Sequence, residues 1–144
     1  MNFSRPLIIS ILALIGIAVS AYLLTVHWGM WSAVCLGVGD CEAVNTSRFS
    51  EFLGLPVALW GILAYAGIFA LSVALQRGIA VEWARRLLFF GAAIGVAFSA
   101  YLTYIEVFVL HEICPWCVLS AILITMIAVL SVLELRDAEQ YAET

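Results

Sequence analysis

The four cysteines are the residues whose type and spacing are most informative about chemistry. They form two close pairs, Cys35 with Cys41 and Cys114 with Cys117. Thiols this close along a chain are compatible with reversible thiol–disulfide exchange, with static disulfides that staple loops, or with thiolate coordination of a soft metal ion. The position of each pair in the predicted fold is needed to decide among these three uses.

The second pair lies in the motif CPWC, which runs directly into an uncharged apolar stretch. Proline suits the first turn of a helix, so Pro115 predicts a helix that begins here. Cys114 then lies at or next to the N-cap, and Cys117 lies about one turn deeper on the same side. The partial positive charge of a helix N-terminus favours thiolates, which makes this pair suitable for thiol–disulfide exchange.

The composition indicates a membrane protein. Of the 144 residues, 65% are hydrophobic and only 11% are charged, and the mean hydropathy is +1.12, far outside the range of soluble domains. Ten Asp plus Glu face six Arg and no Lys. This acidic balance leaves no basic stripe, so nucleic acid is excluded as a partner.

Four uncharged stretches of about 20 residues are long enough to cross a bilayer as helices, and they lack the alternation of barrel strands. They are residues 7–26, 56–75, 87–105 and 114–133, and we expect the third helix to continue to residue 109. The sequence therefore predicts an all-α fold, a polytopic four-helix membrane bundle that forms a single domain over residues 1–144.

The first stretch also fits a cleaved signal peptide, since Arg5 precedes an apolar run. However, its segment GIAVSAYL at 16–23 recurs as GVAFSAYL at 95–102, where no cleavage is expected. The repeat indicates a helix-packing face that is used twice. We therefore expect the first span to be retained.

Arginines flanking the spans predict the orientation. Only Arg48 lies in the connections 27–55 and around His111, and the other side carries Arg5, Arg77, Arg85, Arg86 and Arg136. Both termini are thus expected in the cytoplasm. Every cysteine then lies outside or at the outer membrane edge, a compartment that favours disulfides.

The connection 27–55 is long enough to require a role. Its residues Phe49, Phe52 and Leu53 are spaced as on one face of a short amphipathic helix that lies on the mouth of the bundle. We expect this loop and helix to form an extracytoplasmic cap. From this loop the first cysteine pair is accessible to a water-soluble thiol protein, whereas Cys117 is accessible to a hydrophobic electron acceptor in the bilayer.

Together these features resemble the vitamin K epoxide reductase family, in particular its bacterial members. The resemblance rests on Cys35 and Cys41 in the first outer loop, on CEAVNTS with Ser47 six residues after Cys41, on FLGLPVALWGILAY entering the second helix, and on CPWC opening the fourth. It covers nearly the whole chain.

The resemblance implies a quinone-reducing thiol–disulfide oxidoreductase of the bacterial inner membrane, with ubiquinone or menaquinone as cofactor and no metal. By this match Cys117 reacts with the quinone, Cys114 takes electrons from Cys41, and Cys35 forms a reversible disulfide with Cys41. Ser47 is implied to help position the redox centre.

Bacterial members of the family oxidise a thioredoxin-like protein, which is sometimes fused at the C-terminus and which introduces disulfides into secreted proteins. Here the fourth span is followed only by LRDAEQYAET. We expect the partner to be a separate protein or a domain outside this sequence. Vertebrate members have a tyrosine where this chain has Ala121, so vitamin K epoxide is not assumed to be a substrate.

Two other functions are compatible with the cysteines, namely static disulfides and soft-metal transport of the mercury or copper type. Trp116 is predicted either to pack against the quinone ring or to belong to the outer aromatic belt. Glu106, His111 and Glu112 are expected to be solvated interface residues, with proton relay as the alternative.

Overall fold

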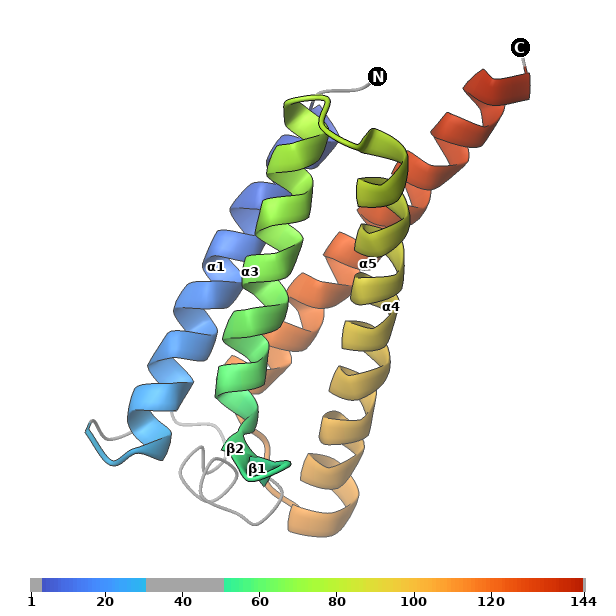
Figure 1. Cartoon of the computed structure of the whole chain (residues 1–144). Coiled ribbons are helices and arrows are strands. Elements are labelled where there is room, and N and C mark those ends of the chain that lie inside the picture. Colours follow the sequence, from blue (N-terminus) through green and yellow to red (C-terminus); the bar gives the residue numbers. More distant parts are fainter. Residues whose placement is uncertain (1–3, 31–50, 144) are drawn as a thin grey trace.

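The computed structural model describes residues 4–30 and 51–143, in which four long helices form a bundle (Figure 1). The helices are α1 (Ser4–His27), α3 (Val57–Gln76), α4 (Val81–Tyr104) and α5 (Pro115–Glu143), and the π-helical segment η2 (Ile105–Leu110) continues α4. All four are long and apolar enough to cross a membrane. The prediction of an all-α membrane bundle is confirmed.

The helices extend beyond the uncharged stretches. α4 begins at Val81 and so includes Glu82, Arg85 and Arg86, and α5 continues through the charged tail to Glu143. Alanine, glutamate and arginine are good helix formers, and these segments are rich in them. An uncharged stretch therefore indicates the part of a helix that can lie in lipid. It does not indicate where the helix begins or ends.

Residues 51–56 form a small antiparallel hairpin of β1 (Glu51–Phe52) and β2 (Leu55–Pro56). The chain reverses at Leu53 and Gly54, which have φ values of 54° and 80°, and the proline after Leu55 favours extended backbone there. The predicted short amphipathic helix is therefore wrong over its described part, because helix cannot continue through this turn. Phe49 lies outside the described residues.

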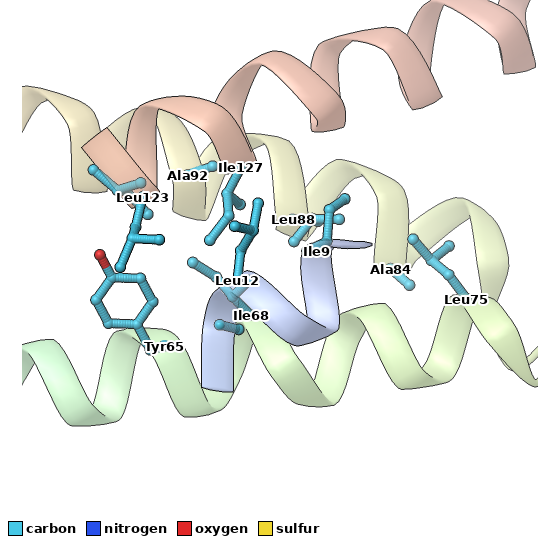
Figure 2. Close-up of a cluster of buried hydrophobic side chains, with 12 residues drawn as sticks. Ile9, Leu12, Tyr65, Ile68, Leu75, Ala84, Leu88, Ala92, Leu123 and Ile127 are labelled. Atoms are coloured by element: carbon cyan, nitrogen blue, oxygen red, sulfur yellow. The ribbon is translucent and has the colours of Figure 1, made fainter. Parts of the chain in front are cut away.

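The hydrophobic core lies where all four helices meet in the half of the bundle nearer the termini. Figure 2 shows its side chains converging from every helix, and small residues of α4 allow close helix packing. The residues labelled there are Ile9, Leu12, Tyr65, Ile68, Leu75, Ala84, Leu88, Ala92, Leu123 and Ile127. Because α1 supplies part of this core, the first span is an integral element of the bundle.

The repeated motif packs as predicted. A Cβ atom on Gly16 would overlap the ring of Tyr65 in α3, and one on Gly95 would lie 2.8 Å from Cγ1 of Ile124 in α5. Glycine at these two positions therefore lets neighbouring helices approach closely.

The two ends of the bundle differ in chemistry. Both termini lie at one end together with the α3–α4 turn, whereas the hairpin and the start of α5 lie at the other (Figure 1). At the terminal end, buried Glu134 lies 4.0 Å from Nη1 of Arg5 and 3.9 Å from Nε of Arg85, and Arg5 also pairs with Asp137. These contacts join α1, α4 and α5 by charge.

Candidate active site

Cys114 and Cys117 lie at the N-terminus of α5, as the CPWC motif predicts. Pro115 is the first helical residue, and the backbone N–H of Cys117 donates a hydrogen bond to Sγ of Cys114 at 3.3 Å. Cys114 thus acts as the N-cap and satisfies a donor that the helix start would leave unpaired. Both residues are free thiols, and Cys114 is completely buried.

The helix start favours negative charge on the first sulfur. A hydrogen bond from the Cys117 thiol, supported by the backbone N–H groups of Cys117 and Trp116, holds the pKa of Cys114 below its usual range. Burial and the nearby Glu106 carboxyl act in the opposite direction but do not cancel this effect. Of the two cysteines, Cys114 therefore forms a thiolate more readily, and a thiolate is the form that thiol–disulfide exchange requires.

A cavity of about 360 Å³ lies between the helices in the half of the bundle that carries the cysteines, and Cys117 is part of its wall. Most of the lining is apolar, with aliphatic and aromatic side chains from α1, α3, α4, η2, α5 and the hairpin. A cavity of this size and character is typical of sites for small, largely apolar ligands. Cys117 is thus placed to react with such a ligand.

Hydroxyl groups supply the polar points of this apolar cavity. Ser20 of α1 and Ser99 of α4, the equivalent serines of the repeated motif, both line it, as do Thr103 and Ser120. The hydroxyl of Tyr65 donates to the carbonyl oxygen of Ser120 at 2.8 Å and lies 2.9 Å from its Oγ. A few hydroxyls in an apolar wall are what is needed to orient a ligand that has carbonyl oxygens.

The hairpin covers part of the cavity. The ring of Phe52 packs at 6.1 Å from the ring of Trp60 in α3 and at 5.7 Å from that of Phe98 in α4. The indole N–H of Trp60 also donates to the carbonyl oxygen of Phe52 at 2.9 Å. Phe52 therefore bridges α3 and α4 and contributes to the wall.

Among the residues that the structure describes, Glu106 is the one acidic residue that lines the cavity. It is only 4% exposed, and its carboxyl interacts with the backbone N–H of Cys114 and with the thiol of Cys117. The expectation that Glu106 is a solvated interface residue is wrong, because η2 turns its side chain inward. His111 is exposed and Glu112 half-buried, and neither lines the cavity.

The sequence model of the vitamin K epoxide reductase (VKOR) family matches residues 7–132. The chain belongs to this family. VKOR-family proteins are membrane thiol–disulfide oxidoreductases that use a quinone as electron acceptor. The apolar cavity, with hydroxyls and the thiol of Cys117 in its wall, has the size and chemistry of a site for the head group of a quinone.

The remaining predicted VKOR site residues have different positions. Trp116 packs against Tyr22, with ring centroids 5.1 Å apart, and is not among the cavity-lining residues, so its contact with a quinone stays a prediction. Cys35, Cys41 and Ser47 lie outside the described residues, and their roles stay predictions too.

Within residues 4–30 and 51–143, no group of three or more histidine, cysteine or acidic side chains is arranged to hold a metal ion. Soft-metal transport by this VKOR-family protein would need ligands from the loop cysteines, which are not described.

Proposed function

We propose that this VKOR-family protein oxidises an extracytoplasmic thioredoxin-like protein and reduces a membrane quinone, and thereby supports disulfide bond formation. The observation that carries the proposal is the position of Cys117, which forms part of the wall of an apolar cavity one turn below the Cys114 N-cap. One sulfur thus faces the lipid-soluble substrate, while the other lies at the end of the bundle to which the loop of Cys35 and Cys41 is attached.

In this proposal electrons pass in pairs from the protein partner, through the loop cysteines and the CPWC cysteines, to the quinone. The partner's dithiol becomes a disulfide as the Cys35–Cys41 pair is reduced, and Cys41 then exchanges with Cys114 so that the CPWC pair becomes the dithiol. Cys114 and Cys117 next form their S–S bond and release two electrons toward the cavity. The quinone, when bound, accepts these two electrons and two protons. Because 30 mV corresponds to about 1.4 kcal/mol for a two-electron couple, a quinone drives this sequence strongly.

The proposed location is the bacterial cytoplasmic membrane, with both termini in the cytoplasm and the cysteines on the extracytoplasmic side. Two features support this orientation. Arg5 and Arg85 lie at the end of the bundle that holds both termini, and positive residues favour the cytoplasmic side of a membrane. Disulfide chemistry also requires the oxidising compartment.

The test is an anaerobic assay of the purified, oxidised protein with a reduced thioredoxin-like partner and a short-chain quinone, followed by quinone absorbance. The wild type should consume quinone only when the partner is present. Cys117→Ala should abolish consumption, while Val118→Ala, an exposed neighbour on the same helical turn, should retain it. Unchanged quinone consumption by Cys117→Ala would disprove the proposal.

A second variant tests the role of the loop pair. Cys35→Ala should block turnover with the protein partner but permit turnover with a small dithiol that reduces the CPWC pair directly. Full activity of Cys35→Ala with the protein partner would remove Cys35 from the electron path.

A further inference from the structure

Glu106 is a buried carboxyl group within a candidate membrane span, where an ionisable side chain is costly to maintain. It lies in the candidate span Val81–Leu110 and is 4% exposed. Acidic residues within membrane spans are rare, and they mark substrate and proton pathways more often than they serve packing. Its position therefore calls for a functional explanation.

The backbone around Glu106 is unusual in a way that directs this side chain. Residues 105–110 are π-helical, the segment ends at His111 with φ 54°, and Ile105 and Glu106 are buried while Val107, Phe108 and Val109 are exposed. π-helical turns shift side chains relative to the α-helical register and occur frequently at functional sites. Here the shift brings the carboxyl to the cysteines.

The contacts of the carboxyl link the cysteine pair to the cavity. It interacts with the Cys117 thiol and with the backbone N–H of Cys114, and it also lines the cavity that Cys117 lines. One carboxyl group thus interacts with the sulfur that loses a proton in the proposed reaction, and it lines the cavity in which a quinone would take up protons. Among the residues that the structure describes, no other acidic side chain lines this cavity.

We propose that Glu106 is the catalytic proton carrier between the Cys117 thiol and the quinone. This inference rests on the proposed function and deepens it. As a carboxylate, Glu106 accepts the proton when the S–H bond of Cys117 breaks. As a carboxylic acid, it then donates that proton to a quinone oxygen. Glu106 is therefore a carboxylate again at the end of the turnover.

The reaction balances with one further proton. Cys114 and Cys117 lose two electrons and two protons and gain one S–S bond, and the quinone gains two electrons and two protons to become quinol. Glu106 carries the Cys117 proton. In the overall balance the Cys114 proton goes to solvent, and one proton from solvent completes the quinol.

The central test compares wild type with Glu106→Gln, which keeps the shape and an oxygen acceptor for the Cys114 N–H but cannot carry a proton. General acid–base groups contribute about 100-fold or more, so kcat for quinone reduction should fall about 100-fold. KM for the quinone should stay within about threefold, because binding is not affected. Glu106→Asp should recover part of the rate, and Glu112→Gln is the matched control that should leave kcat unchanged.

A second measurement needs no quinone. Infrared difference spectra between the reduced and oxidised protein should show a carboxyl C=O band that responds to the redox state of the cysteines. This band should be absent in Glu106→Gln and present in Glu112→Gln. Thermal midpoints of all variants establish that each is folded.

Two results would overturn the inference: a folded Glu106→Gln protein with wild-type kcat, or difference spectra that are the same with and without Glu106. Either result leaves the proposed function intact as long as Cys117→Ala is inactive. Failure of the proposed function has a different signature, namely quinone consumption that does not depend on Cys117.

Discussion

At the scale of single residues, the two CPWC sulfurs differ because of where the helix begins. Cys114 receives hydrogen bonds from the thiol and the backbone N–H of Cys117, whereas Cys117 faces an apolar cavity beside a carboxyl group. A thiolate is thus favoured at Cys114, while the sulfur of Cys117 lies in an apolar wall. In the proposed function this difference assigns Cys114 to thiol–disulfide exchange and Cys117 to the quinone.

This asymmetry predicts how Cys114 titrates. In a protein that lacks the loop cysteines, the first thiolate to form should be that of Cys114, because hydrogen bonds to its sulfur lower the pKa of this thiol from its ordinary value. Since the Cys117 thiol is the largest cause of the lowered pKa, Cys117→Ala should move the midpoint to higher pH. Ultraviolet thiolate absorbance against pH measures it, with Val118→Ala as control. An unchanged midpoint in Cys117→Ala would contradict this assignment.

At the scale of elements, the cavity depends on a close contact between α1 and α3. Gly16 leaves room for the ring of Tyr65, whose hydroxyl reaches across to Ser120 of α5. Figure 2 shows the Tyr65 ring extending from α3 toward α5. The Tyr65 side chain of α3 thus contacts both α1 and α5 at the border between core and cavity.

Gly16→Ala should therefore destabilise the protein and disturb the site. The added Cβ would overlap the Tyr65 ring, and overpacking of this kind costs about 1–3 kcal/mol. We expect a lower thermal midpoint and a higher KM for quinone. Gly67→Ala in α3 is the matched control, because nothing lies within 4 Å of its added Cβ. Equal midpoints for the two variants would show that the Gly16 contact can relax without cost.

The elements were predictable where the signal is local. Uncharged stretches reveal the spans, and Pro115 reveals the start of α5, because lipid and helix geometry act on neighbouring residues. The spacing of Phe49, Phe52 and Leu53 predicts a helix, but it does not reveal the positive φ values of Leu53 and Gly54, at which the chain turns into a hairpin. Glu106 was mistaken for a solvated residue because hydrophobic periodicity does not reveal a π-helical turn.

The cavity was not predictable because its wall is assembled from segments far apart in the sequence. Ser20, Tyr65, Ser99 and Ser120 come from four different helices, and each alone is an unremarkable hydroxyl in an apolar span. The recurring serine of the repeated motif was the only available signal. A serine at these positions is equally compatible with helix packing and with lining a binding site, so the sequence alone does not distinguish these two roles.

At the scale of the whole molecule, stability and chemistry are placed at opposite ends of the bundle. The end with both termini contains the ion pairs of Arg5 and Arg85 with Glu134. It also contains a buried network in which Oγ of Ser10 lies 2.7 Å from Oγ of Ser72 and accepts a hydrogen bond from Nε2 of Gln76 at 2.7 Å. The other end contains the cavity and the free thiols of Cys114 and Cys117. Firm packing at one end allows a ligand-sized cavity between the helices at the other, which close packing would otherwise remove.

This division predicts that the two properties respond separately to mutation. Glu134 is 3% exposed and faces both Arg5 and Arg85. Glu134→Ala leaves these two partly buried guanidinium groups without this carboxylate, at a cost of about 1–3 kcal/mol. Its thermal midpoint should fall well below that of Glu139→Ala, an exposed acid on the same helix. KM for quinone should stay the same at temperatures where both variants are folded, because the cavity lies at the opposite end. A Glu134→Ala protein with an unchanged midpoint, or with a raised KM at such temperatures, would show that the ends are not independent.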